Sequence, residues 1–366
     1  MTSNIKSGVA GLANLLPLVA AEATAMEEQR RLPAHLATVL GKHGLFRMLV
    51  PRTHGGGELA PLDVLDIVET LATADGSVAW CVMVCATTGM LAAYLDEEAA
   101  AEIFGAPDAV VGGVAAPRGT AVASGEGFEV SGRWSWASAS AVCTWLMGGF
   151  RVDGESGAPR LAFLPAEQVR LVDDWDPLGL RGTGSGSFDV SSARVPDRRT
   201  CAVSAAPRPG SSPVYAFPPA VMTALCIASV GCGLARAAFE AVGGILDSDD
   251  PMLGTATAAL ARQSAARAFL RDQVAQAWDV ATTGDSLSEA MIAQLRLSAV
   301  HAARTAAEQC RVVQDIAGGA GVPFSGTLGR RVRDAQTVTA HALVSPRLYR
   351  QLGGRLFMPV AASANG

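Results

Sequence analysis

The pattern of apolar and polar positions changes twice along the chain and divides it into three stretches. Up to about Ala109, apolar residues recur every three or four positions, as in Leu62–Leu71, which is the spacing of an amphipathic helix. A glycine-rich turn at 55–57 separates two such segments, and Asp96 precedes another as a predicted N-cap. We therefore expect a helical domain over residues 1–110.

The middle stretch consists of short alternating segments separated by Gly, Pro and Asp, which is typical of β-strands. Regularly spaced short strands of this kind indicate a small antiparallel barrel or sandwich, expected here over residues 111–208. The strand candidates are Phe128–Trp134, Trp145–Phe150, Leu161–Leu164 and Phe188–Val195.

Long helical periodicity returns after Pro207–Pro213, where prolines, serines and a glycine indicate a linker. The segments that follow are rich in alanine, and small residues allow helices to pack closely, as in a four-helix bundle. We expect this bundle over residues 209–366, which makes the whole chain an α+β protein. Its predicted long helices are Ala220–Ile245, Thr255–Thr283 and Ser286–Ile316.

Composition excludes several classes of protein. The 366 residues are 49% hydrophobic and 17% charged, whereas disordered chains combine low hydrophobicity with high net charge. The 29 basic and 34 acidic residues give a net charge of −5 and are mixed throughout, so no nucleic-acid partner is predicted. The high apolar content also suggests surface buried between subunits.

The N-terminal run Val9–Ala25 is better interpreted as an amphipathic helix than as a membrane segment. It is interrupted by Asn14 and Glu22 and is shorter than the ~20 apolar residues that a bilayer helix needs. Its basic residues follow the apolar run, whereas those of a cleaved signal precede it. We therefore predict a protein without a membrane partner.

Cysteine and histidine usage predicts no metal site. The seven cysteines include no CxxC pair, and Cys81 and Cys85 have no His nearby to complete a ligand set. The five histidines do not cluster in the sequence. We interpret the thiols as buried groups of a reducing compartment and expect a cytoplasmic protein. Common nucleotide-binding, metalloprotease and hydrolase motifs are missing from the sequence.

Two segments are candidates for a ligand site. One contains glycines and hydroxyl residues, and the other contains two tryptophans. Arg181–Ser185 has glycines that allow close backbone approach, and its hydroxyls suit a phosphate or a polar ring edge. A plain glycine-rich hairpin is the simpler interpretation of that segment. Trp134 and Trp136 are spaced by two, so in a strand they would share a face and could wall a flat ring. Filling the core of a barrel is the alternative for these two side chains.

The order of several segments resembles the acyl-CoA dehydrogenase superfamily over nearly the whole chain. The resemblance is closest to its reduced-flavin-dependent monooxygenases, the oxygenase components of two-component systems such as 4-hydroxyphenylacetate hydroxylases. The motifs that carry it are Gly44–Pro51, His54–Gly56, Ala74–Trp80, Gly132–Ser138, Gly179–Ser185, the pair Gly318 and Gly319, and the pair Arg333 and Asp334.

The choice of branch depends on a missing base. An acyl-CoA dehydrogenase needs a carboxylate to remove the proton α to a thioester. Many dehydrogenases have that Glu where this chain has Ala342, and Glu240 is close to the alternative position without matching it. His341 matches instead the His of the monooxygenase branch, although a lone His on an alanine-rich helix is more often structural.

The resemblance implies that reduced flavin reacts with O2 to form a C4a-hydroperoxide that hydroxylates an aromatic or polycyclic substrate. His341, with a pKa near neutral, would manage protons, and Ser138 would lie near flavin N5. Trp80 and Thr88 would contact substrate, with Thr88 standing where many phenol hydroxylases have a second His. The flavin-binding residues implied are Trp134, Trp136, Ser138, Arg181, Thr183, Ser185, Gly318 and Gly319.

The resemblance also implies partners. A separate reductase would supply FMNH2 or FADH2, since the chain has no nicotinamide-binding fingerprint, and the family usually forms homotetramers. Asp315, beside Gln314, stands where dehydrogenases often place a Gln near the diphosphate, so both FAD and FMN remain candidates. The alternatives are an acyl-CoA or acyl-carrier dehydrogenase-like enzyme with a relocated base, and a non-catalytic flavin-binding or scaffolding protein.

Overall fold

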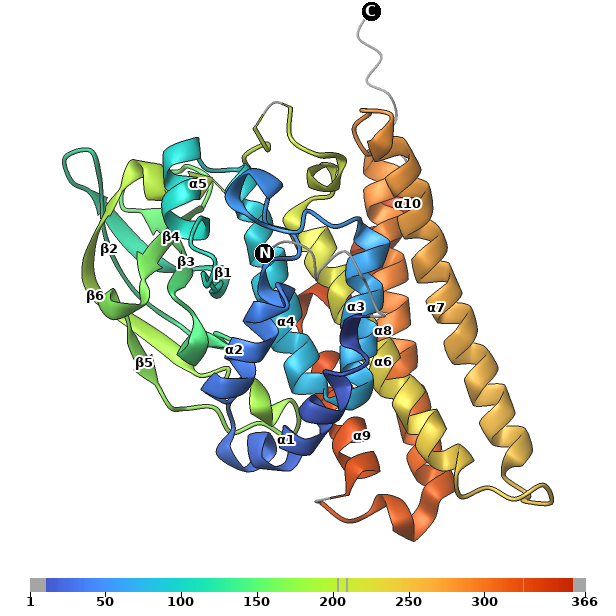
Figure 1. The fold of residues 1–366 in the computed structure, drawn as a ribbon. Helices are drawn as coiled ribbons and strands as arrows, with labels where there is room; N and C mark the ends of the chain where they lie inside the picture. Colours follow the sequence, from blue (N-terminus) through green and yellow to red (C-terminus); the bar gives the residue numbers. More distant parts are fainter. Residues whose placement is uncertain (1–10, 203, 209, 325, 358–366) are drawn as a thin grey trace, which may run out of the picture. The chain divides into compact units, whose positions relative to one another are not determined.

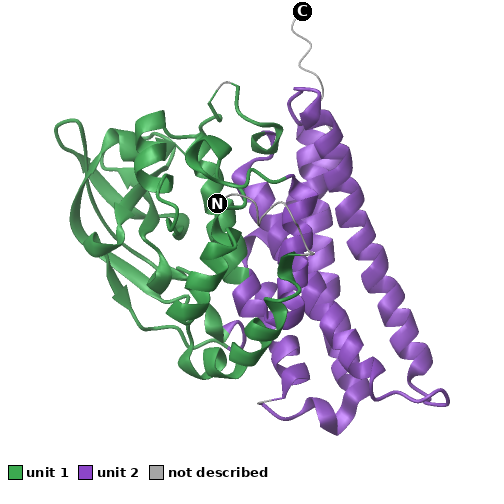
Figure 2. Cartoon of the chain, viewed as in Figure 1, with its two compact units in different colours: residues 1–59, 80–177, 181–215 green, residues 60–79, 178–180, 216–366 purple. Residues whose placement is uncertain are grey.

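The computed structural model describes residues 11–202, 204–208, 210–324 and 326–357 (Figure 1). The chain divides into two compact units, each assembled from separate stretches of sequence (Figure 2). Unit 1 comprises residues 1–59, 80–177 and 181–215, and unit 2 comprises residues 60–79, 178–180 and 216–366. The division into domains 1–110, 111–208 and 209–366 stays a prediction.

Unit 1 contains a seven-stranded sheet with the order β5-β6-β2-β1-β3-β4-β7. All four predicted strand segments are present, as β2, β3, β4 and β6. The strands are β1 (Val111–Ala123), β2 (Gly127–Trp134), β3 (Trp145–Val152), β4 (Arg160–Pro165), β5 (Arg170–Val172), β6 (Ser187–Pro196) and β7 (Thr200–Ala202).

The expectation of a purely antiparallel sheet was wrong at one strand pair. β1 and β3 run parallel, with Val111 opposite Trp145, while the other neighbouring strands are antiparallel. A parallel pair needs a crossover of a dozen or more residues, and here β2 and the segment 135–144 provide it. Periodicity within a strand does not encode the direction of its neighbour, so the sequence pattern could not reveal this pair.

Two apolar clusters stabilise the sheet. Leu161 and Phe163 of β4 belong to one cluster, and the alternate residues Ala162 and Leu164 belong to the other, as expected for side chains that alternate between faces. The first cluster also includes Phe104 of helix α5. Four helices of unit 1 are α1 (Leu16–Gln29), α2 (Ala34–Lys42), α4 (Gly76–Thr88, from residue 80 onward) and α5 (Glu97–Phe104).

The predicted N-cap of α5 is confirmed. The Asp96 side chain accepts a hydrogen bond from the Ala99 backbone N–H at 2.7 Å, which satisfies one of the free donors at the helix start. The N-terminal helix expected over Val9–Ala25 begins outside the described residues, and α1 starts at Leu16.

Unit 2 is helical, and the three predicted long helices are present as α6, α7 and α8. Small residues allow the close packing expected of them. A Cβ added at Gly233 of α6 would lie 2.2 Å from the Glu69 carbonyl oxygen on α3, so only glycine fits at this crossing. The helices are α3 (Pro61–Ala74), α6 (Pro219–Gly243), α7 (Leu253–Thr282), α8 (Glu289–Ala317), α9 (Thr327–Val338) and α10 (Arg347–Phe357).

Two apolar segments are long enough to cross a membrane by length and composition, but both are core helices. Residues Gly76–Ala93 are 94% buried within the structure and residues Pro219–Gly243 are 83% buried. A span exposed to lipid would present its apolar surface outward, whereas these segments bury theirs against protein.

Candidate functional site

Two loops of unit 1 lie side by side and form the centre of the candidate site. The Ala137 N–H donates to the Gly186 carbonyl and the Ala139 N–H donates to the Thr183 carbonyl, both at 2.9 Å. Ala139 has a φ of 60° and Trp136 a φ of 71°, which are left-handed values that non-glycine residues rarely adopt. Strained backbone of this kind is concentrated at functional sites.

A row of three buried hydroxyls joins these loops. The Ser138 Oγ lies 2.6 Å from the Ser185 Oγ, which lies 2.7 Å from the Thr183 Oγ1. We call these three residues the hydroxyl row. The Trp80 indole N–H, from α4, donates to the Ser138 Oγ at 3.0 Å. The four residues are between 1% and 7% exposed, so water has little access to the row.

Trp80 and Thr88, predicted to contact substrate, both lie on α4 and are buried. The Thr88 hydroxyl donates to the Val84 carbonyl at 2.9 Å, one turn earlier in the same helix. Trp80 directs its indole N–H at Ser138. Contact with substrate stays a prediction for both residues.

Trp134 and Trp136 do not share a face, which corrects the expectation from their spacing. β2 ends at Trp134, and the left-handed backbone at Trp136 breaks the strand alternation. Trp134 is 0% exposed, stacks on Phe188 with ring centroids 4.9 Å apart, and donates its indole N–H to the Gly149 carbonyl. It fills the sheet core. Trp136 is 72% exposed and presents an open aromatic face.

Arg181 is already engaged by protein groups. Its guanidinium donates to the Glu27 carbonyl at the end of α1, to the Pro177 carbonyl, and to the Asp176 carboxylate at 3.0 Å. These bonds fix the start of the turn Arg181–Thr183. In unit 1, Arg181 therefore supports the loop, and its predicted contact with flavin remains untested.

His341 lies in unit 2 at the start of the short turn Ala342–Val344. Its Nδ1 accepts a hydrogen bond from the Leu343 backbone N–H at 3.2 Å, which assigns the ring hydrogen to Nε2. Burial lowers the His341 pKa from 6.5 to about 4. The expectation of a near-neutral pKa was therefore wrong, because desolvation disfavours the imidazolium. At pH 7 the neutral imidazole therefore predominates, with its hydrogen on Nε2.

A cavity of about 500 Å³ opens along the chain segment that contains His341. Its lining combines hydroxyl, apolar and basic side chains. The lining residues are Thr339, Ala340, Ala342, Ser345, Arg347 and Leu348.

The glycine pair Gly318 and Gly319 ends α8 at the surface of unit 2. A Cβ at either position would meet no atom within 4 Å, so neighbouring protein atoms do not exclude a side chain there. Gln314, one turn earlier, donates its side-chain amide to the Gly321 carbonyl at 3.3 Å, and Asp315 is exposed. The role of this turn in flavin binding stays a prediction.

Asp334 of α9 has a clear structural role. Its carboxylate, 4% exposed, accepts a hydrogen bond from the Leu180 backbone N–H at 2.6 Å. A Cβ at Gly179 would lie 2.4 Å from the Arg333 carbonyl oxygen, so glycine is required there. Leu180 itself has a φ of 54°. Asp334 thus holds the residues just before the Arg181–Ser185 segment.

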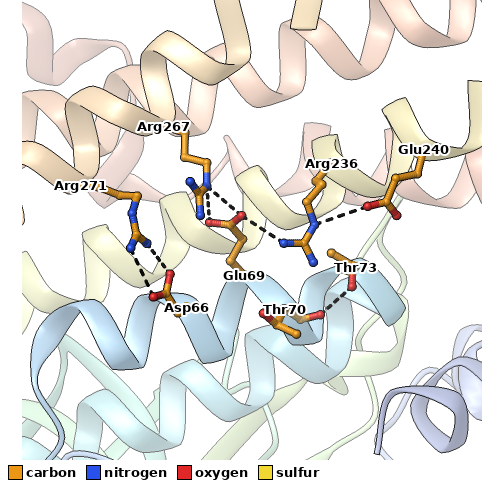
Figure 3. Close-up of polar contacts among 8 residues, drawn as sticks. All are labelled: Asp66, Glu69, Thr70, Thr73, Arg236, Glu240, Arg267 and Arg271. Atoms are coloured by element: carbon orange, nitrogen blue, oxygen red, sulfur yellow. Dashed lines mark hydrogen bonds and ion pairs between the residues drawn. The ribbon is translucent and has the colours of Figure 1, made fainter. Parts of the chain in front are cut away.

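Three carboxylates on α3 and α6, those of Asp66, Glu69 and Glu240, lie within ion-pair distance of arginines (Figure 3). Glu69, whose side chain is 6% exposed, bonds Arg267 at 2.8 and 2.9 Å and lies 3.7 Å from Arg236. Glu240, 67% exposed, lies 3.7 Å from Arg236. Glu240 therefore lacks the apolar surroundings that tune a carboxylate for proton abstraction from carbon. We call Asp66, Glu69, Arg236, Glu240, Arg267 and Arg271 the ion-pair ladder.

All seven cysteines are free and buried, as predicted. A hydrogen bond with Cys143 and burial raise the pKa of the Cys85 thiol well above its usual value. Such thiols are poor nucleophiles, because the thiolate is the reactive form. Among the described residues, no group of three His, Cys, Asp or Glu side chains is placed to hold a metal ion.

The residues of unit 1 fit a flavin. An isoalloxazine has polar nitrogen and oxygen atoms along one edge and two flat faces. The hydroxyl row offers uncharged donors and acceptors, and Trp136, whose carbonyl accepts from the Ser138 N–H at 3.1 Å, offers an aromatic face.

Sequence reasoning identified the members of the hydroxyl row but missed its connection to Trp80. Trp80 and Ser138 are 58 residues apart, and Leu180 and Asp334 are 154 apart. No local periodicity reports such contacts. The left-handed backbone at Ala139 was missed as well, because alanine rarely adopts it.

Comparisons with known proteins place the chain in a family. Residues 17–104 match the model of the acyl-CoA dehydrogenase N-terminal domain, and residues 225–346 match that of the acyl-CoA dehydrogenase C-terminal domain. Indole-3-acetate monooxygenase of Pseudomonas putida is 33% identical over 350 residues, 90% of this chain and 88% of that protein. The oxygenase component of the FADH2-dependent resorcinol hydroxylase of Rhizobium sp. is 32% identical over 91% of this chain and 88% of its own length.

Solved structures agree with these relatives. The crystal structure of 3-HSA hydroxylase from Rhodococcus sp. RHA1 is similar with a TM-score of 0.90 and 27% identity, covering 94% of this chain and 95% of that one. The predicted acyl-CoA dehydrogenase-like fold, with helices, a central sheet and a C-terminal helical region, is confirmed. The chain belongs to the acyl-CoA dehydrogenase superfamily and, within it, to the oxygenase components of flavin-dependent monooxygenases.

Proposed function

We propose that this chain hydroxylates an aromatic or polycyclic substrate with one atom of O2, using FADH2 or FMNH2 delivered by a separate reductase. Bound reduced flavin would supply the activation of O2 and the electrons. The relatives named as monooxygenases and hydroxylases support this proposal, and the observation that carries it is the buried, uncharged hydroxyl row. Uncharged donors bind a reactive oxygen group without offering a strong acid that would decompose it.

In this proposal Ser138 donates a hydrogen bond to the flavin, and the low exposure of the row keeps water away. His341 acts as a neutral group that donates from Nε2, since its Nδ1 is occupied by the Leu343 N–H. With a pKa of about 4, it accepts a proton only transiently at neutral pH. Trp80 and Thr88 are the proposed substrate contacts.

Three further parts of the proposal concern the reductase, the oligomeric state and the location in the cell. The names of the two-component relatives support a flavin reductase as partner, with transfer of reduced flavin by diffusion or by contact. The apolar composition supports a homotetramer, and the reduced, buried cysteines support a cytoplasmic location.

The test is a single-turnover reaction of the purified chain with reduced flavin, O2 and a panel of phenols, indoles and polycyclic aromatics. Hydroxylated product and H2O2 are both measured. We expect Ser138→Ala to raise the H2O2 fraction about tenfold or more, since one donor at a reacting oxygen is worth at least that factor. His341→Ala should lower product yield more than flavin affinity.

The exposed Ser248, in a surface loop of unit 2, offers the matched control Ser248→Ala, which should behave as wild type. Wild-type ratios of product to H2O2 in both Ser138→Ala and His341→Ala would contradict the proposed roles. Anaerobic bleaching of bound oxidised flavin by an acyl thioester would instead identify a dehydrogenase.

A further inference from the structure

The contact between Trp80 and Ser138 has a fixed direction. An indole N–H can only donate, so at 3.0 Å the Ser138 Oγ must accept. A serine hydroxyl has one hydrogen to donate and two lone pairs to accept with. Trp80 therefore occupies one of the two acceptor positions of Ser138 and leaves its hydrogen undetermined.

The rest of the hydroxyl row decides where that hydrogen points. At the 2.6 Å contact between Ser138 and Ser185, and at the 2.7 Å contact between Ser185 and Thr183, either oxygen can donate. If Thr183 donates to Ser185 and Ser185 donates to Ser138, both lone pairs of Ser138 are used. The Ser138 hydrogen must then leave the row. In the opposite order, Ser138 spends its hydrogen on Ser185.

The two orders differ only by rotation of hydroxyl hydrogens, so no heavy atom needs to move. The backbone of Thr183, at one end of the row, is held by two further contacts. The Thr183 carbonyl accepts from the Ala139 N–H at 2.9 Å and from the Cys81 thiol at 3.7 Å. Burial makes an unpaired hydroxyl hydrogen costly, so a ligand acceptor at Ser138 selects the order that donates to it.

We propose that Trp80 and Ser185 are positioning residues. Both donate to the Ser138 oxygen, so the Ser138 hydrogen is left to donate to the bound flavin. Thr183 supports this order by donating to Ser185. The inference rests on the proposed function, because it assigns Ser138 the role of donor. It makes Trp80 part of the oxygen-handling machinery, whereas its position in the sequence suggested only contact with substrate.

Three variants test the inference by each removing one donor, and a fourth retains the donor as a matched control. Trp80→Phe removes the indole N–H, and Ser185→Ala removes the central hydroxyl. Thr183→Val removes the terminal hydroxyl, whereas Thr183→Ser retains it. The readouts are the affinity and absorption spectrum of the bound oxidised flavin, and the H2O2 fraction in single turnovers. Far-ultraviolet circular dichroism establishes that each variant is folded.

We expect Trp80→Phe, Ser185→Ala and Thr183→Val each to shift the flavin spectrum and to raise the H2O2 fraction about two- to tenfold, the range for one neutral hydrogen bond. Thr183→Ser should recover the wild-type values. In a Ser138→Ala background, Trp80→Phe should add nothing, because it acts through Ser138. A purely structural role would give additive effects and no rescue by Thr183→Ser.

The outcomes separate this inference from the proposed function. If Ser138→Ala raises H2O2 release while Trp80→Phe and Thr183→Val keep the wild-type spectrum and ratio, the positioning role is overturned and the proposed function stands. If Ser138→Ala itself behaves as wild type, the donor role fails and both are overturned. Should Trp80→Phe fail to fold, the matched pair Thr183→Val and Thr183→Ser decides.

Discussion

The hydroxyl row of unit 1 and the ion-pair ladder of unit 2 are both clusters of polar side chains, but their chemistry differs. Ser138, Ser185 and Thr183 are uncharged, and each contact between them can reverse its donor. In the ladder, Glu69 can only accept and Arg267 can only donate, at 2.8 and 2.9 Å (Figure 3).

This difference separates a site that can respond to a ligand from one that holds helices together. A neutral row can reorient its hydrogens at little cost, whereas separating a largely buried carboxylate from its arginine leaves a charge unpaired. The ladder joins α3 to α6 and α7 through charged pairs. We therefore assign stability to the ladder and chemistry to the row.

The largest expected effect is on stability, from Glu69→Gln. Loss of the charge on a side chain that is 6% exposed leaves Arg267 without its partner and should lower the free energy of unfolding by about 2 kcal/mol. This estimate is below the value for a fully buried pair, because Arg267 is 39% exposed. Chemical denaturation measures it, and flavin affinity should stay unchanged.

Asp66→Asn, at the half-exposed pair with Arg271, is the matched control and should cost less. Folded Glu69→Gln should form as much product per O2 consumed as wild type. A lower ratio would show that the ladder also takes part in the reaction, which would contradict the division between row and ladder.

The next largest effect is on the pH dependence of the free energy of unfolding. His341 ionises between pH 4 and 7, whereas the hydroxyls of the row and the Trp80 indole do not. Its folded-state pKa is about 4, below the 6.5 of the unfolded chain. The unfolded chain therefore binds the proton more readily, and stability that is complete above pH 6.5 is lost as pH falls towards 4.

The loss should be about 1.5 kcal/mol, roughly half of the full linkage value, because the ring is half-buried. The measurement is the difference in unfolding free energy between wild type and His341→Gln at pH 7 and at pH 4.5. A difference that does not change with pH would show that His341 is not desolvated.

The smallest effect is predicted for Glu240→Gln. Glu240 is 67% exposed and pairs only loosely with Arg236, so the change in unfolding free energy should stay within about 0.5 kcal/mol. Product yield and H2O2 release should be those of wild type. A large loss of activity would revive the alternative of a dehydrogenase with Glu240 as its relocated base.

Much of the fold could be predicted because it depends on periodicity. The helices α6, α7 and α8 begin and end within three residues of their predicted bounds, and the four predicted strands are present. The strand β1 was missed, although it is 13 residues long. Residues 115–118 of β1 are all exposed, and two bulge-like register shifts against β3 flank Pro117, so the alternation that marks a strand is broken there.

The candidate site was only partly accessible from sequence. Thr183 and Ser185 could be nominated because hydroxyl residues beside glycines are visible in the sequence, and Ser138 because it matches a serine of the monooxygenase branch. The separation of Trp134 from Trp136 could not, because it depends on a left-handed residue after the end of β2. The pKa of His341 likewise depends on burial, which comes from distant segments of the chain.

The sequence by itself determined the class of elements, the family and the inventory of uncharged polar side chains, because periodicity and residue type are local properties. Tertiary structure alone decided that Trp80 donates to Ser138, that Trp134 fills the sheet core and that Glu69 is held by Arg267. Each of these is a contact between residues far apart in the chain. Hydrogen-bond direction, burial and charge pairing exist only once the fold brings such residues together.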